Sequence, residues 1–450
     1  MSKVAQFKEY IKGKRVSVIG IGISNRPLIK YLVSLGAEVC AYDKKTENQL
    51  GDIAKEFKEI GVTLVLGDNY LDNLSGDIIF KTPGMRYDNP AILKAQENGS
   101  IITSEMEVFF EICPANIIAV TGSDGKTTTT TLIYTMLKEA GYKTYVGGNI
   151  GTPLMTRAEE MCASDYVVLE LSSFQLHTMK KSPRIAIITN ITPNHLDWHT
   201  DYAEYVDAKK NIMRYQSAGD ILVTNAGNEE ANKIGEGAKG EYRSFSSKVD
   251  ALVHLNGDMI CYGDEEILNI KDIKIPGMHN VENYMTAIGA VHDLVDKNVI
   301  NKVAKDFGGV PHRIELVREL DGVRYYNSSI DSSPNRTANT LNTFSEPVVL
   351  IAGGKDKGIP YDEVGAPIAE HVKTLILIGA TSKVIDEAVK KTGVVIPTFF
   401  VNTYDEAVKK AKESAVSGDV VLLSSASTSF DMFNNFEERG NLFKELVNKL

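Results

Sequence analysis

Three segments of the chain alternate short apolar runs, rich in Val, Ile and Leu, with stretches of helical length. The first segment holds the runs RVSVIGIG (15–22), EVCAYDKK (38–45) and DIIFKTPG (77–84). This alternation is typical of parallel sheets whose strands are joined by crossover helices. We therefore predict an α/β unit here that ends near EICPAN (111–116), where a proline interrupts the chain.

The second segment repeats the pattern with runs that each end in small or polar residues: IIAVTGS, YKTYVGGNIG, DYVVLELSS, RIAIITNIT and DILVTNA. The following stretch, ALVHLNGDMICYGDEEILNIKDIKI, alternates apolar and polar residues around the turns NGD and YGD. That alternation predicts a small antiparallel insertion. HNVENYMTAIGAVHDLV then returns to helical periodicity, and a second hinge is expected at DFGGVPHR (306–313), where paired glycines precede a proline.

The third segment supplies VRYYNSS, PVVLIAGG, TLILIGA, TFFVN and DVVLLSSAS, again with spacers of helical length. A chain of 450 residues exceeds what one hydrophobic core usually serves. We predict three α/β domains at residues 1–112, 113–309 and 310–450. The first and last are expected to be Rossmann-like, and the central one to be a P-loop ATPase-type domain that carries the antiparallel insertion.

Composition narrows the class of protein. The chain is 43% apolar and 24% charged, as in an ordinary globular protein, and its formal net charge is -10. Without clustered Lys and Arg, this charge argues against a nucleic-acid surface. No uncharged apolar stretch is long enough to span a bilayer, the start lacks an apolar signal core, and the four cysteines are too far apart for a zinc knuckle or a CxxC motif. We expect a cytoplasmic monomer with no membrane insertion.

The stretch AVTGSDGKTTTTT (119–131) predicts a phosphate-binding loop between a strand and a helix. It is tighter than the common G-x-x-x-x-G-K-[ST], because Gly122, Gly125, Lys126 and Thr127 form G-x-x-G-K-T. Backbone N–H groups and the positive end of the helix would converge on an anion there. Lys126 would contact the β- and γ-phosphates and the Thr127 hydroxyl would contact Mg²⁺. The alternative is a plain strand-to-helix connection, which a lysine at the helix start disfavours.

Two further stretches supply candidate metal ligands. Glu170 ends the strand in DYVVLELSS, where a buried carboxylate needs either Mg²⁺ or a hydroxyl such as that of Ser172 as a partner. His195 lies in ITNITPNHLDWH and is a candidate second ligand. Since a lone histidine is more often structural, the alternative is a group of loop caps formed with Asp197 and His199.

The stretches TGSDGKTT, GGNIGTP, LELSSFQL, TPNHLDWH and DAKKNI, in this order, resemble the Mur ligases and their folylpolyglutamate synthetase relatives. The C-terminal GDVVLLSSASTSFDMFNNFEERGNLF is similar to the branch of that family that adds D-glutamate. The resemblance spans all three segments and implies an ATP-dependent amide ligase of peptidoglycan precursor synthesis. It implies that ATP phosphorylates the terminal carboxylate of UDP-N-acetylmuramoyl-L-alanine, and that the amine of D-glutamate then attacks the acyl phosphate.

The resemblance also implies roles for residues of the ATP and metal sites. The implied ATP contacts are Gly122, Ser123, Asp124, Gly125, Lys126, Thr127, Thr128, Asn283 and Arg313. The implied ligands of two Mg²⁺ ions are Thr127, Glu170, His195 and Lys209, and the implied catalytic residues are Lys126, His195 and Lys209. Lys209 matches the lysine that the family carbamylates. An unmodified lysine, with a reference pKa of about 10.4, repels a metal, whereas its carbamate is an anion. Taken alone, Lys209 is equally consistent with a solvated helix residue.

Substrate contacts are implied as well, all but Asn149 in the outer segments. Those for the UDP substrate are Ile23, Ser24, Asp43, Thr82, Pro83, Gly84 and Asn149. Those for D-glutamate are Lys357, Ser429 and the backbone of Phe436, although Ser429 and Phe436 taken singly fit loop and core packing equally well. Gly20-x-Gly22-x-x-Asn25 begins like a dinucleotide fingerprint, with Asn25 in the place of the third glycine. An NAD site is therefore the less favoured alternative for the first domain.

The stretch YYNSSIDSSPNRT (325–337) departs from the family pattern. Relatives usually carry Asn-Asp-Ser here, whereas this chain has Ser328 in the place of the aspartate. Ile330 stands where one branch carries lysine, and Asp331 where small residues are usual. Either Asp331 takes over the lost contact or ATP binding is weakened. Asp124, often asparagine in relatives, adds an unexplained anion near the phosphates.

Three alternatives to a D-glutamate ligase remain open. One is a sister ligase that adds another amino acid. The second is a folate polyglutamylating enzyme, whose reaction would not explain an N-terminal domain that resembles a nucleotide-binding domain. The third is a weakly active paralogue that binds UDP-muramoyl compounds, suggested by Ser328 and opposed by the joint presence of Lys126, Glu170, His195 and Lys209.

Overall fold

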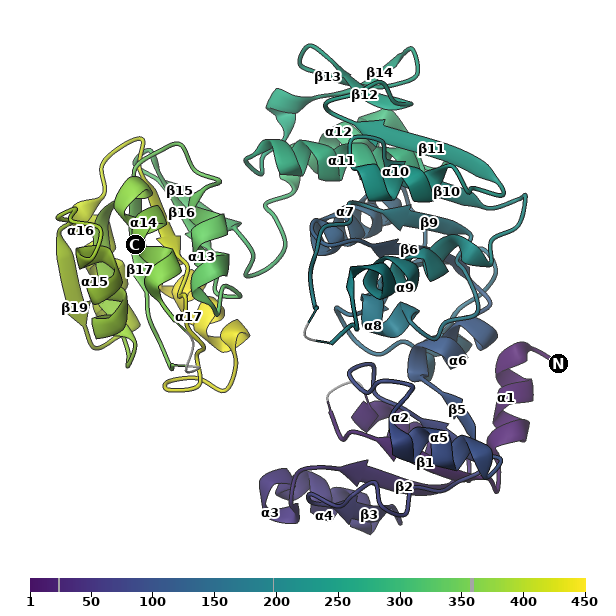
Figure 1. Ribbon diagram of the computed structural model, residues 1–450. Coiled ribbons are helices and arrows are strands. Elements are labelled where there is room, and N and C mark those ends of the chain that lie inside the picture. Colours follow the sequence, from purple (N-terminus) through teal and green to yellow (C-terminus); the bar gives the residue numbers. More distant parts are fainter. Residues whose placement is uncertain (23–24, 197, 357–359) are drawn as a thin grey trace. The chain divides into compact units, whose positions relative to one another are not determined.

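The computed structural model describes residues 1–22, 25–196, 198–356 and 360–450 of the chain. These residues form two compact units, Met1–Ile270 with Glu282–Val303, and Lys271–Val281 with Ala304–Leu450. The first unit contains two sheets and the second contains one (Figure 1). The predicted α/β class is confirmed, whereas the boundary near residue 112 lies within the first unit and stays a prediction. No helix in the described ranges is long and apolar enough to cross a membrane.

The N-terminal sheet is parallel throughout, with the Rossmann-like strand order β3-β2-β1-β4-β5. Its strands are β1 (Arg15–Ile19), β2 (Glu38–Asp43), β3 (Thr63–Leu66), β4 (Ile78–Phe80) and β5 (Ile101–Thr103). Its helices are α1 (Lys3–Ile11), α2 (Asn25–Ser34), α3 (Glu47–Leu50), α4 (Asp52–Glu59), α5 (Pro90–Glu97) and α6 (Glu105–Ile112). After β1 the chain first adds β2 and β3 on one side and then β4 and β5 on the other side. In open α/β sheets, ligands bind at the carboxyl ends of the strands where the strand order reverses in this way.

The central sheet has nine strands in the order β14-β13-β12-β11-β10-β9-β6-β8-β7. They are β6 (Asn116–Thr121), β7 (Thr144–Gly148), β8 (Tyr166–Glu170), β9 (Ile185–Ile188), β10 (Ile221–Asn225), β11 (Glu241–Ser246), β12 (Val253–Asn256), β13 (Met259–Tyr262) and β14 (Glu265–Asn269). The antiparallel insertion is confirmed as β12–β14, and it extends the parallel sheet because β12 pairs with β11. Val120 of β6 pairs with Glu170 of β8, so the carboxyl ends of these two strands lie together.

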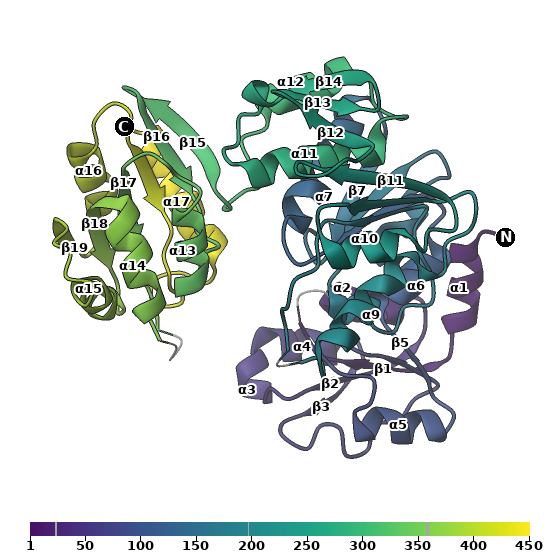
Figure 2. The same cartoon turned by 45° about the horizontal axis from the view of Figure 1, so that its top comes forward.

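Helices cover the central sheet, and Figure 2 shows α7, α9 and α10 beside its parallel strands. The helices between residues 126 and 306 are α7 (Lys126–Glu139), η1 (Met155–Glu160), α8 (Ser173–Leu176), α9 (Tyr202–Arg214), α10 (Glu229–Gly235), η2 (Ile270–Asp272), α11 (Met278–Val291) and α12 (Lys297–Asp306). One apolar cluster runs from Val4 in α1 to Ile234 in α10 and includes residues of both sheets. The two sheets of the first unit therefore share a continuous core.

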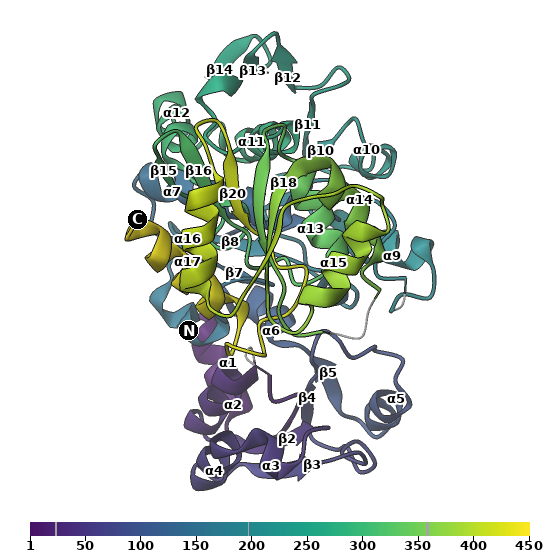
Figure 3. The same ribbon diagram turned by 90° about the vertical axis from the view of Figure 1, so that its left-hand side faces the viewer.

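The second unit contains a six-stranded sheet in the order β15-β16-β20-β17-β18-β19. Its strands are β15 (Glu315–Leu320), β16 (Val323–Asn327), β17 (Val348–Ala352), β18 (Val372–Ile378), β19 (Thr398–Val401) and β20 (Val420–Leu423). All neighbours are parallel except β15 and β16, and β15 is not among the strands that the sequence predicts. Figure 3 shows α13 (Pro334–Leu341), α14 (Asp362–His371) and α15 (Ser382–Lys390) on one side of the sheet, and α16 (Tyr404–Ser414) and α17 (Phe436–Asn448) on the other.

Candidate active site

The predicted phosphate-binding loop connects β6 to α7, and two of its positions require glycine. Gly125 has a φ of 77°, and a Cβ atom added to it would lie 2.4 Å from Asn283 Oδ1. A Cβ atom added to Gly122 would lie 1.9 Å from Thr189 Oγ1. The loop thus packs tightly against Thr189, just after β9, and against Asn283 of α11, whose role as an ATP contact stays a prediction.

The segment after β9 holds the loop in place through both backbone and side-chain bonds. Thr189 Oγ1 donates to the carbonyl of Asp124 at 2.6 Å, and Asn190 Oδ1 accepts from the Asp124 N–H at 3.0 Å. The Ser123 N–H donates to the Asn190 carbonyl at 2.9 Å. Sequence reasoning missed Thr189 and Asn190, although the polar end of the run RIAIITNIT was a usable signal.

Lys126 lies at the start of α7, where its ammonium group donates to the Ser123 carbonyl at 2.7 Å. Thr127 is 8% exposed and Thr128 is half-buried. Thr129 and Thr130 are fully buried, so these two side chains point into the core. The loop therefore closes on its own carbonyl, and a bound phosphate oxygen could replace that carbonyl as the acceptor of Lys126.

Glu170 lies at the carboxyl end of β8 and is 2% exposed. Its Oε1 accepts from Asn149 Nδ2 at 2.8 Å. Its Oε2 is buried and has no hydrogen-bond partner among the residues that the structure describes. The Ser172 hydroxyl, the alternative partner, instead caps α8 through Gln175. An unpaired buried carboxylate oxygen is costly, so the donor set at Glu170 fits a cation.

Lys209 lies on α9 and is only 2% exposed, so the alternative of a solvated helix residue is wrong. Its ammonium nitrogen donates to the Gly122 carbonyl at 2.7 Å and lies 4.7 Å from the centre of the Tyr205 ring. Burial lowers the pKa of Lys209 well below its ordinary value, and the charge of Lys126 lowers it further. The side chain therefore reaches the phosphate-binding loop as an amine that loses its proton easily.

Tyr205, one turn before Lys209 on α9, is a loop contact that sequence reasoning missed. Its hydroxyl lies 2.8 Å from Ser123 Oγ, and burial raises the pKa of Tyr205 to about 12. Ser123 Oγ also accepts from the Thr192 N–H at 2.9 Å. The hydroxyl pair ties α9 to both the phosphate-binding loop and the segment after β9.

His195 is exposed and has a φ of 55°, which is unusual for a residue other than glycine. Its ring lies 5.0 Å from the ring of Phe174, and its backbone N–H donates to Asn194 Oδ1 at 2.8 Å. Backbone strain of this kind is often found at functional sites. Its predicted role as a metal ligand stays a prediction, and Asp197 lies outside the described residues.

Of the predicted UDP-substrate residues that the structure describes, Asp43 ends β2, Thr82, Pro83 and Gly84 follow β4, and Asn149 follows β7 of the central sheet. Asp43 Oδ2 accepts from the Ile21 N–H at 2.6 Å, and Thr82 lies beside Gly20. Asn25 Nδ2 donates to the carbonyls of Ile19 and Gly20 at 3.0 and 2.9 Å. Asn25 thus fixes the turn where the fingerprint would have its third glycine, while Ile23 and Ser24 lie outside the described residues.

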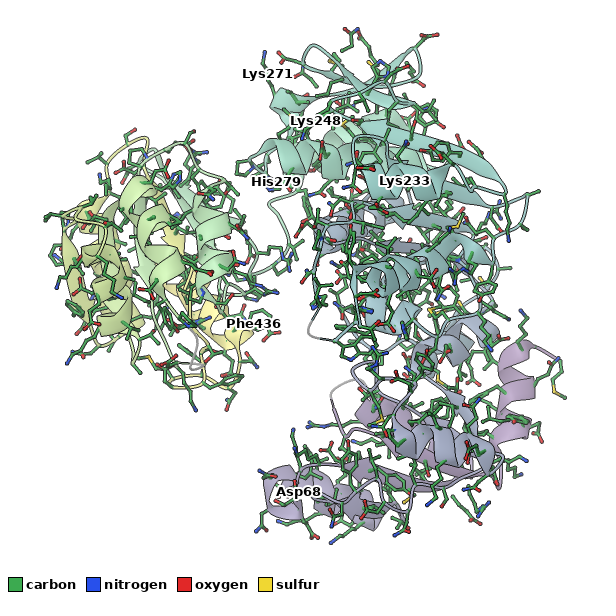
Figure 4. All side chains as sticks on the ribbon, in the orientation of Figure 1. Asp68, Lys233, Lys248, Lys271, His279 and Phe436 are labelled. Atoms are coloured by element: carbon green, nitrogen blue, oxygen red, sulfur yellow. The ribbon has the colours of Figure 1, made fainter. Side chains whose placement is uncertain are left out.

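The predicted D-glutamate residues lie in the second unit. Ser429 is 3% exposed, and Phe436 begins α17 (Figure 4). The Phe436 carbonyl accepts from Ser329 Oγ at 2.8 Å, and the buried Arg439 donates to the Ser329 carbonyl at 2.7 Å. Arg439 lies within the C-terminal stretch that carries the resemblance but was not singled out there, although it connects α17 to the stretch 325–337. Lys357 lies outside the described residues.

Asp331 places a buried carboxylate beside Ser328. Its Oδ2 accepts from Thr340 Oγ1 at 2.7 Å and from Ser424 Oγ at 2.9 Å. Burial raises the pKa of Asp331, whereas a hydrogen bond from Ser328 and the charge of Arg313 lower it. The hypothesis that Asp331 takes over the lost contact stays a prediction, and so does the effect on ATP binding.

Comparison with known proteins gives consistent matches along the whole chain. The Mur ligase middle domain matches residues 120–291, and the Mur ligase glutamate ligase domain matches residues 312–427. A relative from Acetivibrio thermocellus, named UDP-N-acetylmuramoylalanine--D-glutamate ligase, is 56% identical over 100% of this chain and 99% of its own length. A relative of the same name from Ruminiclostridium cellulolyticum is 54% identical over 100% and 99%.

Solved structures resemble the fold at lower identity. UDP-N-acetylmuramate-alanine ligase from Thermotoga maritima aligns with a TM-score of 0.61 and 21% identity, covering 97% of this chain and 99% of that chain. MurF ligase from the same organism, in complex with ADP, aligns with a TM-score of 0.57 and 17% identity, covering 98% and 97%. These likenesses agree with the predicted fold.

Proposed function

The chain belongs to the Mur ligase family, and we propose that it adds D-glutamate to UDP-N-acetylmuramoyl-L-alanine in an ATP-dependent step of peptidoglycan precursor synthesis. One observation carries the choice among Mur ligases. Relatives named for this reaction are 54% and 56% identical over the whole chain, so the similarity includes the N-terminal and C-terminal sheets that would hold the two substrates.

The phosphate-binding loop would hold ATP. The N–H groups at the start of α7 would face the phosphates, and Lys126 would exchange the Ser123 carbonyl for a γ-phosphate oxygen. Asn283, against Gly125, would be a further ATP contact, and so would Arg313. Thr189 and Asn190 hold the loop in one conformation before ATP arrives. This lowers the entropic cost of ATP binding, because the loop does not have to become ordered on binding.

Thr127, Glu170, His195 and Lys209 would hold two Mg²⁺ ions, and the unpaired Oε2 of Glu170 supports this assignment. When bound, Mg²⁺ neutralises the phosphates and the substrate carboxylate, so that the two anions can approach each other. Asn149 donates to the other oxygen of Glu170 and orients this carboxylate. We expect Asn149 also to contact the muramoyl substrate.

Lys209 would act as a carbamate. Its neutral amine would add to the carbon of CO₂, release one proton and become an anion. The lowered pKa favours this addition, because only the unprotonated amine is a nucleophile. The same burial makes a permanently charged lysine unfavourable at this position.

In the proposed reaction, a carboxylate oxygen of the alanyl group forms a bond to the γ-phosphorus of ATP and ADP leaves. Lys126 would stabilise the charge that moves onto the transferred phosphoryl group. The unprotonated amine of D-glutamate then forms the amide bond, and inorganic phosphate and a proton leave. Lys357, Ser429 and the backbone of Phe436 would hold D-glutamate, since a dicarboxylic amino acid needs a cation and fixed donors.

One assay tests the proposal. The protein is incubated with UDP-N-acetylmuramoyl-L-alanine, ATP and Mg²⁺, and phosphate release is measured with D-glutamate, L-alanine, L-lysine and diaminopimelate in turn. We expect release with D-glutamate only, and none from a Lys126→Ala control. Release with another amino acid would identify a sister ligase, and no release with any would favour a paralogue that only binds UDP-muramoyl compounds.

We also propose that the protein is cytoplasmic, because its substrates are small nucleotides and amino acids, and that it acts as a monomer. Light scattering coupled to size exclusion is expected to give the mass of one chain, and twice that mass would contradict the proposal.

A further inference from the structure

Two loops of the first unit are joined directly by hydrogen bonds. One follows β4 and carries Thr82 to Asp88, and the other follows β9 and carries His195 and Trp198. Trp198 Nε1 donates to the Gly84 carbonyl at 2.9 Å. Under the proposed function the first loop contacts the UDP substrate and the second carries a metal ligand, so this bond connects the two halves of the reaction site.

Arg86 reinforces the connection from the same loop as Gly84. Its Nη1 donates to the Trp198 carbonyl at 2.8 Å, and its guanidinium group lies 5.0 Å from the centre of the Trp198 ring. Nη1 and Nη2 also donate to the two carboxylate oxygens of Glu204 at 3.1 and 3.0 Å. This two-point contact fixes both the distance and the plane of the pair, which a lysine could not do.

Glu204 connects Arg86 to the elements that carry the proposed metal ligands. It lies in the first turn of α9, the helix of Lys209, and its Oε2 accepts from the Thr200 N–H at 2.6 Å. Within the preceding loop, the N–H of Trp198 donates to the His195 carbonyl at 3.1 Å. A shift of Glu204 would therefore move both the His195 loop and the start of α9.

Aromatic packing gives the same loop a second support. The Phe174 ring, from α8, lies 5.0 Å from the His195 ring and 4.7 Å from the Trp198 ring. Since α8 directly follows the strand of Glu170, the Trp198 side chain packs against the element next to the proposed metal site.

His177, His199 and Glu204 are also the one trio of His, Cys, Asp or Glu side chains in the described ranges with ligand atoms close enough for a metal ion. Both oxygens of Glu204 already accept from Arg86, however, and a second cation beside this guanidinium group would be repelled. The observations therefore favour an ion-pair bridge over a metal site.

We propose that Arg86, Glu204 and Trp198 are positioning residues that fasten the UDP-substrate loop to the His195 loop. Binding of the UDP substrate then sets the position of His195 relative to the substrate carboxylate. The inference rests on the proposed function and adds to it three residues that contact neither ATP nor the reacting atoms.

Trp198 is the single tryptophan of the chain, so tryptophan fluorescence, excited where tyrosine does not absorb, reports on the surroundings of this one residue of the bridge. We expect UDP-N-acetylmuramoyl-L-alanine, added without ATP, to shift the Trp198 emission of the wild type. The shift is expected to disappear in Arg86→Ala and Glu204→Gln. A matched control is Arg15→Ala, which breaks the Arg15–Asp77 pair at the opposite end of β1 and is expected to keep the wild-type shift.

Kinetics supply the second readout. Arg86→Ala is expected to lower kcat by roughly tenfold to a hundredfold, while the KM for ATP stays within about twofold, because only the placement of His195 and the UDP substrate is disturbed. Arg86→Lys is expected to restore little of the loss. The double variant Arg86→Ala/Glu204→Ala is expected to lose less activity than the sum of the two single losses, since the two changes share the Arg86–Glu204 pair.

Either of two results overturns the proposal. One is a kcat of Arg86→Ala within about twofold of the wild type. The other is a loss of activity in both Arg86→Ala and Arg15→Ala that is proportional to the loss of thermal stability in each variant. If the wild type itself has no ligase activity, the proposed function fails and fluorescence alone decides. A shift of the Trp198 emission that the UDP substrate causes in the wild type but not in Arg86→Ala then supports the bridge. An equal shift in the wild type and Arg86→Ala, or no shift in either, refutes it.

Discussion

Variants that remove the acid at position 331, add one at position 328, or do both test whether these two positions share one site for a buried carboxylate. Asp331 is 5% exposed and accepts hydrogen bonds from Thr340 and Ser424. In Asp331→Ala the Thr340 hydroxyl loses its acceptor, whereas Ser424 Oγ keeps Thr337 Oγ1 as a partner at 2.8 Å. A buried polar group left unpaired costs about 1–3 kcal/mol. We therefore expect Asp331→Ala to destabilise the second unit.

Ser328→Asp would place a second carboxylate beside the first, because the Ser328 side chain hydrogen-bonds to Asp331. Two unit charges about 4 Å apart repel by about 4 kcal/mol at an effective dielectric constant of about 20. Keeping one carboxyl protonated at neutral pH instead costs up to about 4 kcal/mol, from roughly three pKa units at about 1.4 kcal/mol each. A loss of this size lowers the melting temperature of the unit by roughly 8–16 °C.

The double variant Ser328→Asp/Asp331→Ala again contains a single carboxylate, and we expect it to recover most of the stability lost in Ser328→Asp. Calorimetry of the four proteins at pH 8 and pH 6 checks this. The loss in Ser328→Asp is expected to be smaller at pH 6, where protonating one acid is easier. Additive changes in melting temperature would show that the two positions do not share a site. An unchanged KM for ATP in Ser328→Asp would exclude weakened ATP binding through position 328.

Three further predictions concern the first unit. Lys209→Ala is expected to abolish ligase activity, with no rescue by excess bicarbonate, and normal turnover in this variant would exclude the carbamate. Glu170→Gln is expected to lose the Mg²⁺-dependent rise in melting temperature, which in the wild type corresponds to about 2.7 kcal/mol at a hundredfold excess over Kd; a rise equal to that of the wild type would contradict the metal role. Burial raises the pKa of Glu105 from its ordinary value of 4.5 to about 7, so the folded state holds this proton more tightly than the unfolded state does, and stability is lost as the pH rises from 4.5 to about 7. The advantage of Glu105→Gln over the wild type should therefore grow across this window and stay constant above it, and parallel curves of melting temperature against pH would refute the shift.

The phosphate-binding loop and Glu170 could be predicted because their signals are local. A strand, a glycine-bracketed turn and a helix lie within 119–139, and the carboxylate ends an otherwise apolar strand. The parallel register then brings Val120 and Glu170 together without further information. Such predictions need only the rule that carboxyl ends of parallel strands share one edge of a sheet.

The Arg86–Glu204 bridge and strand β15 could not be predicted in this way. Arg86 and Glu204 are separated by 118 positions, and both lie outside regular alternation of apolar and polar residues. Nothing local distinguishes them from solvated surface charges, which are the usual outcome for such residues. The strand β15 lies at the edge of its sheet, and no residue from Glu315 to Leu320 is fully buried, so the apolar signal of a core strand is absent.

Asp124 illustrates how backbone and side chain can have separate roles at one position. The loop is held through the N–H and the carbonyl of Asp124, which bond to Asn190 and Thr189, while its side chain is exposed. The shape of the loop therefore does not depend on whether an acid or an amide stands there. The charge does matter to Lys209, because the anion of Asp124 raises the pKa that burial and Lys126 lower. The acid at position 124 thus affects the protonation of the lysine that the proposed reaction needs as a neutral amine, and it does so without changing how the loop folds.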